Sequence, residues 1–336
     1  MNPDPPVTNA TLTQWSLVVV FPLVDLPEGV SVGHWGDQVG RTGCTVVLTG
    51  GGAVAGVDVR GAAPGTLGTD GLRPSTVIEQ AHAVLLTGGS LYGLMAAGGV
   101  MRWLEERRLG FELAGVIVPT VAGAVIFDLL AGDSGARPNA AAGYAACEAA
   151  GATPEVGAVG AGTGATVGKA LGMEHCMKGG LGIATVAMAR GIAVQAIVAV
   201  NAFGEIVEPN GRILAGVRTR GRIRPIDTLL DLGSHGPPPL TNTTIGVVVT
   251  NASLTREEAN ELASTAHDGL ARTIRPVHTR ADGDTLFVLA TGRTSHAALP
   301  MLDVMALQHA ASRAVAAAVV HAVRRATALA GIPACA

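Results

Sequence analysis

The chain has 336 residues, which is long enough for one large domain or two ordinary ones, and 48% of them are hydrophobic whereas only 15% are charged. The net charge of -3 provides neither a basic field for nucleic acid nor a polybasic patch for a membrane, and no segment reaches the roughly 18–20 apolar residues that cross a bilayer. With so few charges to cover its surface, the chain is expected to bury broad faces in a homo-oligomer.

The first half of the chain alternates between apolar runs and turn-forming residues. Residues 1–14 are polar and rich in proline, and they belong to an N-terminal arm over residues 1–26. Two apolar runs joined by glycines predict a hairpin over Thr42 to Arg60. The pattern then predicts a short buried strand at Val84–Thr87, a helix ending near Arg108, an apolar stretch at Val116–Leu130 and an alanine-rich helix at Pro138–Ala150.

The second half contains a further hairpin and two helices. Leu181–Ala189 and Ile192–Val200 are β-branched runs joined by a tight turn. Residues 204–240 show no clear periodicity and are interpreted as a long exposed connection. The remaining predictions are a strand at Ile245–Thr250, a helix opened by a capping box at Thr255–Glu258, a strand at Leu286–Thr291 and a helix over Asp303–Ala330. Strand pairs with long helices between them favour antiparallel sheets covered by helices.

Asn242 and Thr243 stand where the proline-rich connection becomes a strand. A threonine hydroxyl is a poor nucleophile until a base takes its proton. If the peptide bond before Thr243 is cut, the new α-amine of that residue is a base already in place, and the pKa of such an amine in short peptides is about 8. The alternative is an ordinary turn into a strand, which is the usual structure of an Asn-Thr-Thr sequence.

Asp282 and Asp284 flank a glycine just before the predicted strand at Leu286. Two carboxylates so spaced can reach one point, where they would hold the ammonium or hydroxyl of a threonine and raise the pKa of one another. The alternatives are a plain Asp-Gly turn or half of a calcium loop, although the glutamate that ends an EF-hand loop is absent. We expect the pair to act on Thr243 and not to bind a metal.

The glycine-rich run from Gly160 to Lys169 looks like a phosphate-binding loop but departs from that pattern. Lys169 is followed by Ala170 instead of Ser or Thr, and Thr163 stands where the first glycine is required. The run can still bring one lysine into a pocket by close backbone approach. Asn201 follows an apolar strand, where its amide could donate to an oxyanion or simply form a turn.

Other residue types argue against metals and other nucleophiles. The nine histidines show no zinc-ligand spacing, so neither a metal nor a cofactor is expected. Ser90 is not a nucleophile elbow, because Tyr92 occupies the position of its second glycine. The scattered cysteines form no Cys-x-x-Cys pair, which is typical of reduced thiols in a cytoplasmic protein; they are Cys44, Cys147, Cys176 and Cys335.

Five strings in a fixed order resemble one family. They are VDVRGAAPGTLGTD (57–70), LLTGGSLYGLMAAGGVMRWLEER (85–107), VIFDL (125–129), GAVGAGTGATVGK (157–169) and NTTIGVVVTN (242–251). The family is that of the L-aminopeptidase D-esterase/amidases, the β-aminopeptidases and the 6-aminohexanoate-oligomer (nylon oligomer) endohydrolase. The resemblance covers roughly residues 27–330.

The resemblance implies an α+β fold, a four-layer α-β-β-α sandwich of the N-terminal-nucleophile-hydrolase kind. It implies self-cleavage into residues 1–242 and 243–336, which remain one folded domain, and a tetramer of cleaved heterodimers. It places the catalytic and cleavage-site roles on Asn242, Thr243, Lys169, Asn201, Asp282 and Asp284. It places the substrate pocket at Gly88, Gly89, Ser90, Tyr92 and Phe127, where Phe127 replaces a tyrosine of the nylon-oligomer enzyme.

The resulting hypothesis is an amide hydrolase that acts on small amides, peptides or aminohexanoate-type oligomers through an acyl-Thr243 intermediate. One alternative is an acyltransferase of the ornithine-acetyltransferase type, in which the acyl group passes to an amine instead of water. A second alternative is a non-catalytic binding protein of the same fold, which would remain a single uncleaved chain.

Overall fold

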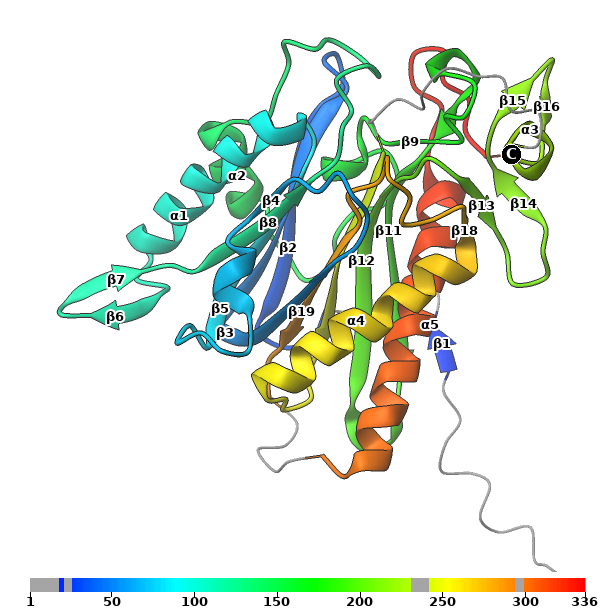
Figure 1. The fold of residues 1–336 in the computed structure, drawn as a ribbon. Coiled ribbons are helices and arrows are strands. Elements are labelled where there is room, and N and C mark those ends of the chain that lie inside the picture. The colour runs from blue at the N-terminus through cyan, green and yellow to red at the C-terminus, as the bar shows by residue number, and fades with distance from the viewer. Residues whose placement is uncertain (1–17, 21–25, 231–241, 294–298, 336) are drawn as a thin grey trace, which may run out of the picture.

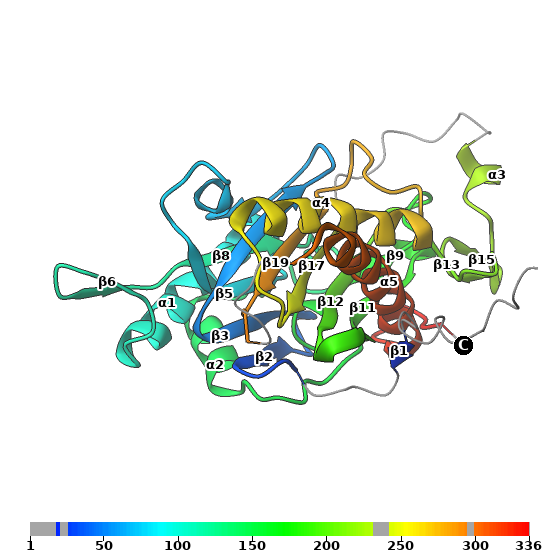
Figure 2. The same cartoon turned by 90° about the horizontal axis from the view of Figure 1, so that it is seen from below.

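A computed structural model describes residues 18–20, 26–230, 242–293 and 299–335. Two pairs of helices enclose the strands, one pair on each side of the molecule (Figure 1, Figure 2). The pairs are α1 (Ala96–Glu106) with α2 (Ala140–Glu148), and α4 (Arg256–Thr273) with α5 (Met301–Arg325). The fold is therefore the predicted α-β-β-α sandwich.

The strands form two stacked halves that share one long strand, β3 (Thr42–Val59). One half runs in the order β1 (Val18–Val20), β11 (Gly180–Ala187), β12 (Ala193–Asn201), β17 (Thr243–Thr250) and β19 (Thr285–Ala290). The other contains β2 (Val30–Asp37), β5 (Gln80–Thr87), β8 (Val121–Val125) and β4 (Thr66–Leu67). Most pairs are antiparallel, but β17 with β19 and β5 with β8 are parallel.

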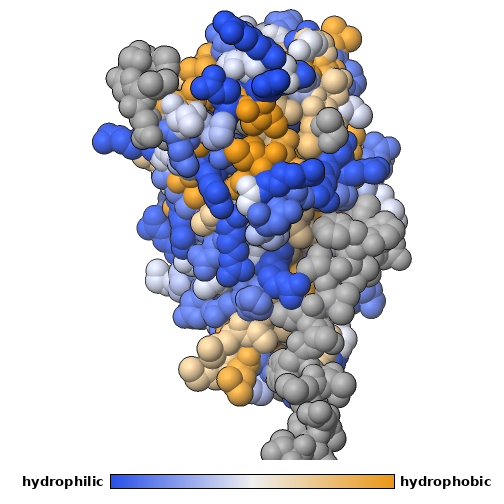
Figure 3. Space-filling view, turned by 90° about the vertical axis from the view of Figure 1, so that its right-hand side faces the viewer, coloured by the Kyte–Doolittle hydropathy of each residue, from blue (hydrophilic) through white to orange (hydrophobic). Residues whose placement is uncertain are grey.

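Short elements surround the end of the sheets where β17 begins. They are β9 (Thr166–Val167) with β10 (Met177–Lys178), β13 (Glu205–Val207) with β14 (Ile213–Ala215) and β18 (Ile274–Arg275), β15 (Arg218–Thr219) with β16 (Arg222–Ile223), and α3 (Asp227–Leu230). Figure 3 shows this side of the molecule, on which apolar residues (orange) lie between hydrophilic ones (blue). The hairpin of β6 (Phe111–Leu113) and β7 (Val116–Val118) projects from the other side (Figure 1).

Two predictions for the strands are wrong. The predicted hairpin over residues 42–60 is one continuous strand, β3: its two parts do not pair with each other, and β5 pairs with both of them. Residues 42–49 pair with β2, whereas residues 54–59 pair with β19. The register of β3 with β5 shifts between Leu48 and Ala53. The glycines at 50–52 thus bend one strand from one half to the other instead of reversing the chain.

The predicted exposed connection over residues 204–240 is structured as far as it is described. Ile206 and Ala215 are fully buried partners in β13 and β14, so this segment packs against the core instead of lying on the surface. Its proline-rich end at 236–239 lies outside the described residues, as does most of the predicted arm. Helix α5 ends at Arg325, before the predicted Ala330. Within the described ranges no helix is both long and apolar enough to span a membrane.

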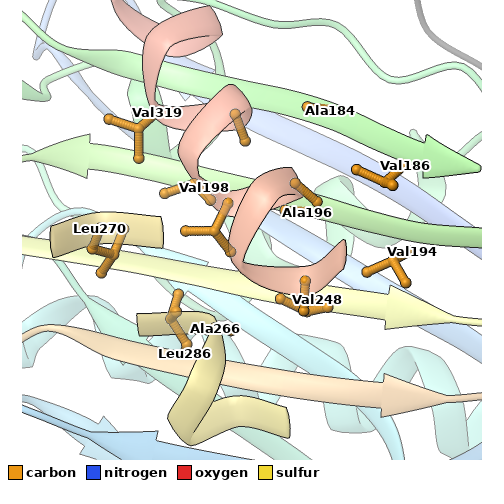
Figure 4. Close-up of a cluster of buried hydrophobic side chains, with 14 of the residues drawn as sticks. Ala184, Val186, Val194, Ala196, Val198, Val248, Ala266, Leu270, Leu286 and Val319 are labelled. Carbon is orange, nitrogen blue, oxygen red and sulfur yellow. The ribbon is translucent and has the colours of Figure 1, made fainter. Parts of the chain in front are cut away.

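Three apolar cores separate the four layers. In β12, Ala196 and Val198 face the core under α4 and α5, whereas Ile197 and Ala199 face the core between the two halves. This alternation follows from the two-residue period of a strand. Figure 4 shows the first core, where Leu270 of α4 and Val319 of α5 cover the sheet. A sheet covered on both faces explains why its strands have continuous apolar sequences.

The helix α4 begins with the predicted capping box. The hydroxyl of Thr255 accepts a hydrogen bond from the main-chain nitrogen of Glu258, at 3.1 Å. The Glu258 carboxylate accepts one from the nitrogen of Thr255, at 2.7 Å. Two of the unpaired donors at the start of a helix are thereby satisfied, which is a local signal that the sequence alone carries.

Candidate active site

Thr243 is the first residue of β17, and the sheet brings two other segments to it. In the antiparallel register of β12 and β17 its partner is Asn201, the last residue of β12. On the other side, Asn242 forms a parallel bridge with Asp282, just before β19 begins. The end of β12 and the starts of β17 and β19 therefore meet at one buried point.

The hydroxyl of Thr243 donates a hydrogen bond to the main-chain oxygen of Asn242. Both residues are almost completely buried, with 5% and 2% of their surface exposed. The predicted nucleophile and the carbonyl group that it would attack thus lie together in a site from which most bulk water is excluded. Exclusion of water strengthens every electrostatic interaction in such a site.

Asn201 is fully buried, and its side-chain oxygen and nitrogen face different neighbours. The oxygen accepts hydrogen bonds from the Lys169 amine at 2.9 Å and from the main-chain nitrogen of Thr166 at 3.0 Å. The nitrogen donates to the main-chain oxygen of Phe127 at 3.2 Å. These donors identify the oxygen end of the amide, and the other end is the NH2 group, which an oxyanion site would use as its donor.

Lys169 is fully buried and donates to both the main-chain and the side-chain oxygen of Asn201, each at 2.9 Å. Burial lowers the pKa of Lys169 to about 7, although the nearby Cys176, Asp282 and Asp128 oppose the shift. A lysine that loses its proton near neutral pH can act as a general base, which an exposed lysine cannot.

Asp284 connects β17 to a histidine. One carboxylate oxygen accepts from the main-chain nitrogen of Thr244 at 2.6 Å, and the other contacts the Nδ1 atom of His278 at 2.8 Å. Asp282 accepts from the main-chain nitrogen of Thr279 at 2.9 Å. Burial, followed by the neighbouring Asp284, raises the pKa of Asp282. The two acids therefore lie beside Thr243, and their described contacts are with the residues around it.

Two of the predicted pocket residues, Gly88 and Gly89, lie against a third buried acid, Asp128. Gly89 donates its main-chain nitrogen to the Asp128 carboxylate at 2.7 Å, and a Cβ atom at Gly88 would lie 2.1 Å from the same carboxylate. Ser90 follows with a positive φ of 52°, while Phe127 reaches the site through its main-chain oxygen. Tyr92 is 56% exposed, so it lies at the outer side of this turn.

The sequence reasoning missed several residues of this site. Three of them bond predicted residues directly: Asp128 bonds Gly89, Thr166 bonds Asn201 and His278 bonds Asp284. The fourth, Lys178, bonds the main-chain oxygen of Ala165, next to Thr166. One available signal was composition: only two of the 23 basic residues are lysines, Lys169 and Lys178. Asp128 lay inside one of the five family strings, as the single charged residue after an apolar strand.

Comparison with known proteins places the chain among amide hydrolases. The family model described as "Peptidase family S58" matches residues 23–334. An uncharacterized aminopeptidase of Mycobacterium tuberculosis (strain ATCC 25618 / H37Rv) is 43% identical over 332 residues, which cover 91% of this chain and 94% of the relative. A 6-aminohexanoate-oligomer endohydrolase of Paenarthrobacter ureafaciens is 36% identical over 278 residues, which cover 80% of this chain and 74% of the relative.

Two solved structures have the same arrangement of layers. A β-aminopeptidase of Burkholderia sp. superposes with a TM-score of 0.62 at 25% identity, covering 88% of this chain and 84% of its own. The L-aminopeptidase D-Ala-esterase/amidase of Ochrobactrum anthropi, described as a variant of the Ntn hydrolase fold, gives a TM-score of 0.67 at 20% identity. The match covers 92% of this chain and 89% of that one, and it supports the fold alone.

Proposed function

The chain belongs to peptidase family S58 and hydrolyses amide or peptide bonds, and from this premise we propose that Thr243 is its nucleophile. In the proposal the chain first cuts itself between Asn242 and Thr243. Residues 1–242 and 243–336 then remain one folded domain. Because β17 and β19 of the second fragment lie between β12 and β3 of the first, sheet pairing on both sides would hold the fragments together.

The observation that carries the proposal is the buried contact between the Thr243 hydroxyl and the Asn242 carbonyl group. In the self-cleavage step Oγ1 attacks the Asn242 carbonyl carbon, and the C–N bond to Thr243 breaks. The hydroxyl proton passes to the departing nitrogen, with the Lys169 amine as its carrier. The product is an ester, which water hydrolyses to a carboxylate at residue 242 and a free hydroxyl at residue 243.

After the cut, the Thr243 amine takes the hydroxyl proton during attack on a substrate carbonyl. The side-chain nitrogen of Asn201 donates to the oxyanion that develops. The leaving amine receives the proton from the Thr243 ammonium, and water then releases the acyl group from Oγ1. Asp282 and Asp284 support this end of the sheet beside Thr243, Asp284 through the main-chain nitrogen of Thr244.

For the substrate we propose small amides, short peptides with a free amino end or aminohexanoate-type oligomers. The names of the relatives support this choice. The turn at Gly88–Ser90 and the Phe127 segment would form the pocket. The relatives do not favour acyl transfer to an amine, because those with a stated activity are hydrolases or peptidases.

We further propose a tetramer of cleaved heterodimers in the cytoplasm. Large apolar side chains on the described surface support oligomerisation, among them Met301 at 79% exposure and Leu113 at 63%. The four cysteines are free thiols, which fits a reducing compartment. Sedimentation of the purified protein tests the assembly state, and a stable species with the mass of one 33.7 kDa chain would contradict it.

Intact-mass spectrometry combined with amine labelling tests the proposed cleavage. Residues 243–336 contain no lysine, so an amine-reactive label on that fragment can only lie on the Thr243 α-amine. We expect two fragments that divide after residue 242, with one label on the second fragment. Labelling rates measured against pH then give the pKa of that amine directly. A single full-length chain in an active preparation, with no fragment that begins at Thr243, would refute the proposal.

A further inference from the structure

The chain uses its two lysines differently from all its other basic residues. The other 21 of the 23 lysines and arginines are arginines, whereas Lys169 and Lys178 are both fully buried. Arginine stays charged in proteins, but a buried lysine can lose its proton. Because lysine occurs only at these two buried positions and arginine is used elsewhere, we infer that both positions need a compact amine. The proposed mechanism uses Lys169 alone.

The Lys178 amine holds the glycine-rich segment, residues 157–169, by its main-chain oxygens. It donates to Ala165 at 2.8 Å and to Gly162 at 3.1 Å, with a weaker third contact to Gly179 at 3.5 Å. These carbonyl groups all accept and none donates, so they favour an amine carrying all its protons. A Cβ atom at Gly179 would lie 2.0 Å from a main-chain oxygen of β12, so the backbones must approach closely here.

The same segment connects Lys178 to the proposed oxyanion donor. Lys178 and Thr166 are direct partners in the two-stranded pairing of β10 with β9. Thr166 donates to the side-chain oxygen of Asn201 from its main-chain nitrogen at 3.0 Å and from its hydroxyl at 3.3 Å. Lys178 is thus the strand partner of Thr166, the residue whose hydrogen bonds orient the Asn201 amide.

We propose that Lys178 is a positioning residue for the reaction at Thr243. Its amine fixes the carbonyl groups of the glycine-rich segment, and the segment in turn fixes Thr166 against Asn201. The inference rests on the proposed function, because it assigns Asn201 the role of oxyanion donor. Burial lowers the pKa of Lys178 to about 7, and the titratable groups near it, Cys176 and Asp128, oppose that shift.

The test compares Lys178→Met with Gln195→Met by steady-state kinetics on the cleaved protein. Gln195 is equally buried in β12, six residues from Asn201, and bonds Thr185 at 2.9 Å away from the site. We expect Lys178→Met to lower kcat by up to roughly 10²-fold with KM unchanged, because a small misplacement of a catalytic group has that effect. Gln195→Met should leave kcat as in the wild type. Amine labels on the 243–336 fragment count the cleaved chains, so uncleaved protein does not affect kcat, and circular dichroism checks that the cleaved protein is folded.

A second variant keeps the inference falsifiable if Lys178→Met does not fold. Thr166→Val removes one hydrogen bond to Asn201 and should lower kcat roughly 2–10-fold. If Lys178→Met folds and has the wild-type kcat, the positioning role is overturned. If Lys178→Met does not fold, a wild-type kcat in Thr166→Val overturns it instead. Failure of the wild-type chain to cleave before Thr243 would instead overturn the proposed function, so the two failures are distinguishable.

Discussion

The middle and one end of the same two strands, β12 and β17, bury opposite kinds of side chain. In the middle, Ile197 and Val247 face the core between the two halves, whereas Val198 and Val248 face the core under α4 and α5. At the end that holds Asn201 and Thr243, polar side chains are also buried. There Asn201 accepts a hydrogen bond from the main-chain nitrogen of Thr166, and Asp284 accepts one from that of Thr244. The apolar core and the proposed chemistry therefore lie on separate stretches of one sheet.

The two stretches have opposite effects on folding. Burying an apolar side chain of this size stabilises the fold by roughly 1.5–3 kcal/mol. Burying an ionisable group without full compensation destabilises it, and the group then shifts its pKa. Lys169, Lys178 and Asp282 all show this shift of the pKa away from the charged form. Substitutions at the end of the sheet should therefore change chemistry, whereas those in its middle should change stability.

The largest effect is expected at Thr243. Thr243→Val keeps the side-chain volume but removes the nucleophile, so we expect no cleavage and no turnover. Thr250→Val at the opposite end of β17 is the matched control, because Thr250 is also fully buried but lies outside the site. Intact mass should show only a full-length chain for the first variant and two fragments for the second. Cleavage of Thr243→Val after residue 242 would show that the nucleophile is another residue.

Asn201→Ala should lower kcat by roughly 10²–10³-fold, the usual result of losing one oxyanion donor. Its comparison is Gln195→Ala in the same strand, where the lost amide lies away from the site. We expect little change in KM for Asn201→Ala and no change in kcat for Gln195→Ala. If Asn201→Ala raised KM and left kcat intact, Asn201 would be a substrate-binding residue.

Stability should rise as the pH increases from 7 to 9. Folding lowers the pKa of both lysines from 10.5 to about 7, so in this range the unfolded chain binds more protons than the folded one. Above pH 9 the buried Cys44 and Cys147 lower the stability as the pH rises, because burial raises their pKa from 9.0 to about 12 and the folded chain then binds more protons than the unfolded one.

Denaturant unfolding of the uncleaved Thr243→Val chain at several pH values measures this dependence without interference from a new α-amine. Adding Lys169→Met or Lys178→Met to that chain should flatten the rise between pH 7 and 9. An unchanged slope in both double variants would mean that neither lysine is the source of the effect.

The smallest effect is expected from the apolar middle of the sheet. Val248→Ala removes two buried carbon atoms from the core under α4 and α5, so the free energy of unfolding should fall by roughly 2 kcal/mol. At a temperature where the variant remains folded, kcat per labelled Thr243 amine should equal that of the wild type. A large loss of kcat at unchanged stability would show that the middle of the sheet also positions the site.

Local patterns were sufficient for the elements whose signals lie within a few residues. The capping box at Thr255 predicted the start of α4, and the apolar runs predicted β11, β12, β17 and β19 to within a few residues. The five ordered strings also predicted the layered fold and the family. The assigned roles of Thr243, Lys169 and Asn201 stay predictions until the variants are measured.

What depended on pairing between distant segments could be decided only by the tertiary structure. The glycines at 50–52 look like a turn locally, but β5 pairs with β3 on both sides of them, and β2 and β19 each pair with one part. Composition marks Lys178 as one of only two lysines, but only its pairing with Thr166 and its burial place it next to the residue that bonds Asn201. The physical reason is that the desolvation and hydrogen bonding of a side chain are set by the segments that fold around it, which its own neighbours in the sequence do not specify.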